Sequence, residues 1–157
     1  MDIKDKYLER AENEIILAKT NFEISINEEL KNRLGIERGR TFFNNVISSC
    51  YYAIFYSAKA ILLHFGIKTD APEEHKKTYD EFKKLVEARR VDKKLFEIYE
   101  EESVKAETLL NIFFTEKRKR GRFTYNVNAN ANKPFAEDSI KNAIFFTKTI
   151  KQLIRKR

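Results

Sequence analysis

The sequence predicts an all-α fold, an up-and-down antiparallel bundle of four long helices and one short helix, in a single domain covering residues 1–157. Two observations carry this prediction. Apolar residues recur at spacings of three and four along most of the chain, which is the period of an α-helix. Glycine and proline are scarce, at 4 and 2 residues, so we expect few tight turns and long helices. Short connections between such helices favour the up-and-down arrangement, and this length fits one domain.

The first two long helices are predicted from their apolar residues. The first covers residues 3–26, and residues 27–39 are predicted to form a connection containing two glycines. The second helix begins between residues 37 and 41 and ends near Gly66, which suits a C-terminal cap. Its apolar residues extend almost all round, so we expect it at the centre of the fold or against a second surface. The apolar stripe of the first helix consists of Leu8, Ala11, Ile15, Ala18 and Phe22.

The remaining helices are predicted from their starting signals. Residues 70–73 ("DAPE") form a capping box that begins a short helix ending near residue 90. Asp92 caps a long helix that runs through Phe113, with Glu102 as the one charged residue on its apolar face. The last helix follows Pro134 and continues to the C-terminus.

Charge and cysteine content restrict the classes of function. The chain has 31 basic and 24 acidic residues, a formal charge of +7, which favours a polyanionic partner. Its one cysteine, Cys50, lies in an apolar run and is interpreted as a buried structural thiol, so the sequence predicts a cytoplasmic protein without disulfides. No signal peptide is recognised, and polar residues interrupt the apolar stretch at 46–65, so we expect no membrane span.

Motifs for metal or cofactor binding are missing from the sequence. Cys50, His64 and His75 are too few for a usual zinc site, and the scattered glycines make no phosphate-binding loop. We therefore predict no metal and no cofactor. His75 lies beside the predicted start of the short helix and is the one candidate catalytic residue, with an ordinary polar helix residue as the alternative.

A basic segment precedes the last helix. Five of the seven residues from Glu116 to Arg122 are basic, and two aromatic residues follow closely. Arginine with interleaved aromatic residues suits phosphates and stacked bases, whereas basic residues also occur at helix ends because they complement the helix dipole. Residues 126–132 are predicted to be a surface loop. The candidate nucleotide- or RNA-binding residues are Arg118, Arg120, Arg122, Phe123 and Tyr125.

Three features in this order resemble the HEPN superfamily. They are a tyrosine-rich helical run ending in glycine, a histidine shortly after it, and an arginine-rich turn that ends in tyrosine before the last helix. In this chain they are "YYAIFYSAKAILLHFG" at 51–66, His75, and "RGRFTY" at 120–125. The resemblance covers about residues 5–155 and is nearest to small HEPN proteins related to the HEPN/nucleotidyltransferase toxin–antitoxin type.

The resemblance implies an all-α bundle that is usually a homodimer. Several HEPN proteins are ribonucleases, often toxins paired with a minimal nucleotidyltransferase antitoxin, and these carry an arginine, then four to six intervening residues, then a histidine. Here residues 57–59 before His64 are Ser, Ala and Lys, and residues 68–70 before His75 are Lys, Thr and Asp. The motif is missing, and arginine alone cannot replace an imidazole in proton transfer. We therefore expect no cleavage of the family's Arg/His type.

The leading prediction is a cytoplasmic, HEPN-like homodimer that binds RNA or a nucleotide, is the partner of a minimal nucleotidyltransferase, or does both. One alternative is a divergent, metal-independent endoribonuclease that uses His75 and the Arg118–Arg122 turn. A second alternative is a purely structural dimerisation or interaction module. On the second predicted helix, Tyr51, Tyr52, Phe55 and Lys59 are predicted to lie in the dimer interface or in the core of the protein.

Overall fold

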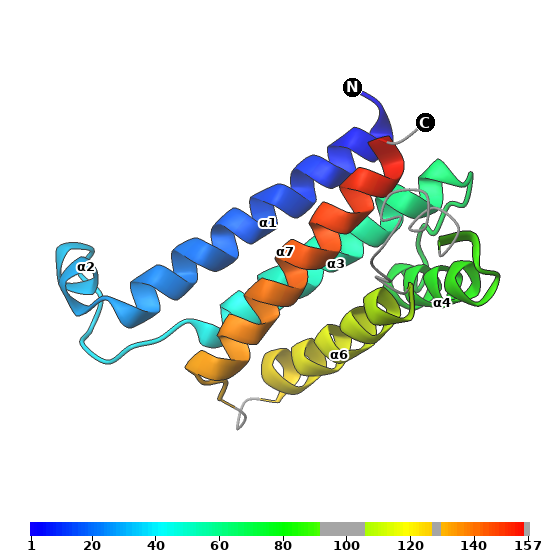
Figure 1. Ribbon diagram of the computed structural model, residues 1–157. Helices are drawn as coiled ribbons and strands as arrows, with labels where there is room; N and C mark the ends of the chain where they lie inside the picture. The colour runs from blue at the N-terminus through cyan, green and yellow to red at the C-terminus, as the bar shows by residue number, and fades with distance from the viewer. Residues whose placement is uncertain (92–105, 127–129, 156–157) are drawn as a thin grey trace, which may run out of the picture.

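The computed structural model describes residues 1–91, 106–126 and 130–155 (Figure 1). In these residues the chain forms helices and no strand, so the all-α prediction is confirmed. The helices pack side by side, and the start of α1 and the end of α7 lie at the same end of the molecule. The helices are α1 (Ile3–Ile26), α2 (Glu28–Arg33), α3 (Phe43–His64), α4 (Glu74–Glu87), α6 (Ala106–Tyr125) and α7 (Lys133–Arg155).

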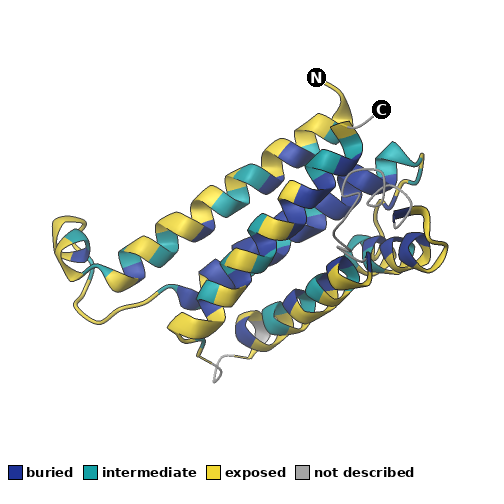
Figure 2. Cartoon of the chain, viewed as in Figure 1, coloured by how far each residue is buried: buried dark blue, intermediate teal, exposed yellow. Residues whose placement is uncertain are grey.

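Helix α3 is the centre of the molecule. It packs against α1, α4, α6 and α7, and Figure 2 shows it buried along most of its length. This agrees with apolar residues on nearly every side of the helix. The helix is long and apolar enough to cross a membrane by composition, but 78% of its most apolar window is buried inside the protein. It is therefore the core helix of this fold.

The C-terminus of α3 lies where the glycine signal predicts it. Gly66 has a φ of 77°, a conformation that glycine adopts without steric cost. The backbone N–H of Ile67 donates to the carbonyl of Leu62, and that of Gly66 donates to Leu63. These bonds satisfy carbonyl groups that the helix end would otherwise leave without partners.

Two predictions about the connections are corrected. Residues 27–39 are not only a connection, because Asn27 caps α2 by accepting a hydrogen bond from the N–H of Leu30. The short helix α4 begins at Glu74 rather than within residues 70–73, and Glu73 has a left-handed φ of 56°. The hydroxyl of buried Thr69 is hydrogen-bonded to the hydroxyl of Thr78 on α4. This hydrogen bond holds the segment before α4 against the side of that helix.

The basic segment is also corrected, because it is helical and not a turn. Helix α6 continues through the basic run to Tyr125, with Phe113 and Phe123 buried on it. Its basic side chains therefore point in several directions around a helix. The predicted start of this helix at Asp92, the position of Glu102 and the loop residues 127–129 lie outside the described residues.

Candidate functional site

The site is formed on one face of helix α3. Tyr51, Phe55 and Lys59 follow one another at intervals of four residues, so they share one face, and Tyr52 lies beside them. Tyr51, Phe55 and Lys59 are buried, whereas Tyr52 is half-buried. Helices α4 and α6 both contact α3 and each other, and they add charged side chains to this face.

The first turn of α4 is fixed to α3 by a buried lysine. The Lys59 ammonium pairs with the Glu74 carboxylate and lies 4.9 Å from the centre of the Tyr7 ring. Burial disfavours the charge on Lys59, but the hydrogen bonds and charges of Glu74 and Tyr7 together outweigh this effect, so the pKa of Lys59 is raised above its ordinary value. The pair holds Glu74, and with it the neighbouring residue His75, against α3.

His75 is half-buried between aromatic side chains. Its ring stacks on Phe55 with 4.1 Å between ring centres and 18° between planes. The Tyr51 hydroxyl lies 2.9 Å from His75 Nδ1, at hydrogen-bonding distance. Among the described residues this is the only hydrogen bond to the imidazole, so Nε2 is available to a ligand.

Arg120 approaches the same two tyrosines from α6. Its guanidinium carbon lies 4.9 Å from the centre of the Tyr51 ring and 5.0 Å from that of Tyr52. Arg120 Nη2 donates a hydrogen bond of 2.9 Å to the Tyr52 hydroxyl. One turn earlier, Lys117 lies 4.7 Å from the centre of the Tyr79 ring. We call His75, Arg120, Lys117, Tyr51 and Tyr52 the His75 cluster.

The surroundings of His75 favour its neutral form. Burial lowers the pKa of His75, and the positive charges of Arg120, Lys117 and Lys59 lower it further, against the opposing effect of Glu74. The imidazole is therefore neutral at pH 7. Because the unfolded chain takes up a proton near pH 6.5 and the folded chain only at lower pH, the stability that His75 contributes is lost as the pH falls below about 6.5.

A neutral His75 has two chemical uses, depending on its tautomer. If the Tyr51 hydroxyl donates to Nδ1, the proton lies on Nε2, which then donates a hydrogen bond to an anion. If Nδ1–H donates to Tyr51, Nε2 carries a lone pair and acts as a general base. In both cases Arg120 and Lys117 provide positive charge beside the imidazole, which suits a phosphate group.

A buried carboxylate sets the orientation of α6. Glu116 is fully buried and accepts hydrogen bonds from Ser139 Oγ at 2.6 Å and Asn142 Nδ2 at 3.0 Å, both on α7. Lys119 Nζ donates to the same carboxylate at 3.1 Å. The network joins α6 to α7 one turn before Arg120. Arg120, four residues after Glu116, reaches α3 through its hydrogen bond to Tyr52.

The other basic residues of α6 line a separate groove. Arg118 and Arg122 are exposed, and the guanidinium of Arg122 lies 4.9 Å from the centre of the Phe123 ring. Phe123 is only 3% exposed and contacts Phe135, so it offers no free face to a base, contrary to the predicted role. We call this 270 Å³ space the α6 groove; it is lined by Phe114, Thr115, Arg118, Lys119, Arg122, Phe123 and Phe135.

The predicted binding residues thus divide between two places. Arg120 belongs to the His75 cluster, Arg118 and Arg122 belong to the α6 groove, and the side chain of Tyr125 lies outside the described residues. Sequence reasoning missed Lys117 as a neighbour of His75, and it missed Glu116. The only sequence signal for Glu116 is that it is the one acidic residue at the start of a basic run.

Two further predictions concern chemistry elsewhere in the chain. Cys50 is buried, and burial raises the pKa of its thiol, which leaves it un-ionised and unreactive. Among residues 1–91, 106–126 and 130–155, no group of three or more His, Cys, Asp or Glu side chains is arranged to hold a metal ion.

Comparisons with known proteins add no family. No protein-family model matches the chain, and no curated protein matches it.

The pKa of His75 provides a test of the cluster. We expect an NMR titration to give His75 a pKa below 6.5, because burial and three neighbouring cations disfavour the imidazolium. Arg120→Ala should move this pKa upward by removing a cation, and Lys117→Ala should do the same. Lys68→Ala, at an exposed loop residue, is the control and should leave it unchanged. A His75 pKa at or above 6.5 in the unmodified protein would contradict the described surroundings.

Proposed function

We propose that this chain binds single-stranded RNA or a nucleotide at the His75 cluster. The observation that supports this proposal best is the convergence of His75 from α4 and Arg120 from α6 on two adjacent tyrosines of α3. Arginine and lysine beside a neutral imidazole form a set of donors that suits phosphate oxygens. The charge of +7 favours the same class of partner.

The aromatic residues near the cluster support binding of bases as well as phosphates. Tyr52 and Tyr79 are half-buried, and Phe114 and Phe135 are 45% and 36% exposed at the α6 groove. Aromatic rings beside a cationic track are typical of proteins that bind single strands, because every base has a face that can stack. On this proposal a phosphate lies at Arg120 and His75, and neighbouring nucleotides extend along α6 towards Arg118 and Arg122.

The resemblance to the HEPN superfamily supports four wider proposals. These are an up-and-down antiparallel bundle, a homodimer, a cytoplasmic location and a minimal nucleotidyltransferase as partner. They rest on the sequence features at 51–66, at His75 and at 120–125. Of the residues proposed for the dimer interface or core, Tyr51, Phe55 and Lys59 are buried within the protomer, which leaves Tyr52 as the more accessible one.

A second candidate function, RNA cleavage, is favoured by the position of His75 beside Arg120. In this candidate function Nε2 of His75 removes the proton of a 2′-hydroxyl while the 2′-oxygen attacks phosphorus and the bond to the 5′-oxygen breaks. Water protonates the leaving oxygen, and Arg120 and Lys117 stabilise the charge on the phosphorus centre. The spacing rule Arg-x4-6-His does not apply, because His75 is on α4 and Arg120 is on α6, and tertiary packing brings both side chains to the tyrosines of α3.

RNA binding is tested by a filter-binding series with a single-stranded oligonucleotide at increasing salt. We expect Arg120→Ala and Arg118→Ala each to weaken binding and to lower the salt slope by about 0.7 to 1, as the loss of one phosphate contact does. Arg38→Ala, at an exposed arginine in the loop between α2 and α3, serves as the matched control and should change neither quantity. Unchanged affinity and slope in folded Arg120→Ala would refute the assignment of the site.

RNA cleavage is tested with two strands that differ by a single 2′-deoxy substitution. If His75 is a general base, His75→Gln should slow cleavage by about 10²- to 10⁴-fold. The 2′-deoxy strand should bind and stay uncut at the substituted position. Binding of both strands without any cleavage by the unmodified protein would remove the ribonuclease candidate and leave the binding proposal intact.

A further inference from the structure

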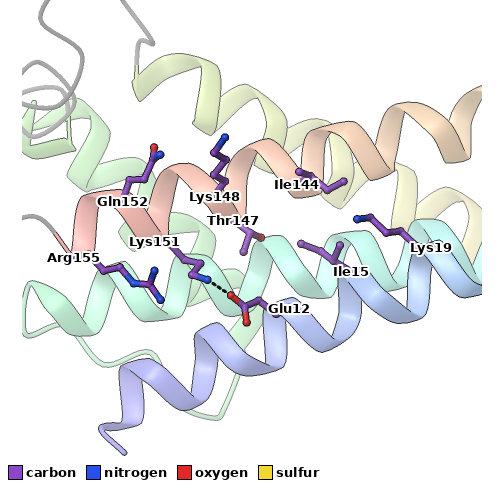
Figure 3. A pocket seen from close by; sticks show the side chains of 9 residues that line it. All are labelled: Glu12, Ile15, Lys19, Ile144, Thr147, Lys148, Lys151, Gln152 and Arg155. Carbon is purple, nitrogen blue, oxygen red and sulfur yellow. Dashed lines mark hydrogen bonds and ion pairs between the residues drawn. The ribbon is translucent and has the colours of Figure 1, made fainter.

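A second groove lies away from the His75 cluster, between α1 and α7 (Figure 3). The two helices pack side by side on α3, and Ile15 and Ile144 face each other across the space between them. Buried Thr147 lies beside them, towards Lys151. We call this 390 Å³ space the α1–α7 groove; it is lined by Glu12, Ile15, Lys19, Ile144, Thr147, Lys148, Lys151, Gln152 and Arg155.

The rim of the α1–α7 groove carries excess positive charge. Four of its residues are cationic and one, Glu12, is acidic. Lys151 pairs with Glu12 across the groove, as Figure 3 shows, so this carboxylate is already neutralised. Within the described part of the chain, Lys19, Lys148 and Arg155 form no ion pair. Three positive charges therefore surround an apolar floor.

Exposed apolar side chains border the groove on both helices. Ile16 is 63% exposed, and it lies four residues after Glu12 and three before Lys19, so it adjoins both on the surface of α1. Phe145 is 37% exposed and lies three residues before Lys148 on α7. Apolar surface thus extends from the floor to both edges.

We propose that the α1–α7 groove binds an acidic amphipathic helix of a partner protein. An extended groove between two parallel rows of side chains suits a third helix, whose apolar residues enter between Ile15 and Ile144. Glutamate or aspartate on the flanks of that helix would meet Lys19, Lys148 and Arg155.

Two other occupants fit the groove less well. A nucleic acid would complement the charge, but its phosphate backbone offers nothing apolar to Ile15, Ile16 or Phe145. A second copy of this chain docked face to face would bring two cationic rims together, which costs free energy. The proposal does not depend on RNA binding at the His75 cluster.

The test uses a labelled peptide of about 18 residues, which is long enough to form a helix. Its leucines are spaced alternately three and four residues apart, and glutamates flank them on both sides. We expect it to bind the unmodified protein. The double variant Lys19→Glu with Lys148→Glu should weaken binding by about ten-fold or more, because it reverses two exposed charges at the rim. Lys6→Glu is the matched control. It is exposed and lies nine residues before Ile15, on the opposite face of α1, and should change binding little.

A scrambled peptide of the same composition should bind much more weakly, because it lacks a continuous apolar face. Three outcomes would overturn the proposal. The first is equal binding of the scrambled and amphipathic peptides. The second is unchanged binding after the double charge reversal. The third is failure of the peptide to bind, together with another effect of the double charge reversal. Loss of RNA binding would then assign the groove to nucleic acid, and a change of oligomeric state, measured by light scattering, would assign it to a second copy of the chain.

Discussion

Burial of α3 on several sides is the constraint on which the rest of the structure depends. Helices α1, α4, α6 and α7 all pack against it, so their positions relative to one another follow from their positions on α3. Its tyrosines lie where α4 and α6 come together. The same packing that removes apolar surface from water therefore also brings His75 and Arg120 to Tyr51 and Tyr52.

The buried Glu116 determines which basic residues face inward. Exposed ion pairs on helices contribute only about 0.3–0.5 kcal/mol, whereas breaking a buried pair costs about 3–5 kcal/mol. The hydrogen bonds from Ser139, Asn142 and Lys119 to Glu116 therefore control the rotation of α6 more strongly than its surface charges do. This rotation directs Arg120 to the tyrosines and leaves Arg118 on the outside.

Local periodicity in the sequence was sufficient to predict much of the fold. The apolar stripe of α1 and the Gly66 cap of α3 are short-range signals, and the structure agrees with them. The prediction of a turn at 120–125 rests on the resemblance to the HEPN pattern and is wrong, because Phe113 and Phe123 are buried on one continuous helix. On a helix, these positions anchor both ends of the segment.

The His75 cluster could not be predicted by spacing. His75 and Arg120 are on different helices and 45 residues apart in the chain, so only tertiary packing brings them together. The motif Arg-x4-6-His tests one local geometry, an arginine and a histidine within about two helical turns. It therefore does not detect His75 and Arg120, which tertiary packing brings together from two helices. The α1–α7 groove was missed for the same reason, since its cations come from both ends of the sequence.

Arg120, and not Arg118, contacts the tyrosines of α3. A double-mutant cycle in urea unfolding tests it directly, using Arg120→Ala and Tyr52→Phe. Because the two side chains share a hydrogen bond and a ring contact, we expect a coupling energy of about 0.5–3 kcal/mol. The parallel cycle with Arg118→Ala should give less than about 0.5 kcal/mol. Equal coupling energies in the two cycles would show that Arg120 is no closer to Tyr52 than Arg118 is.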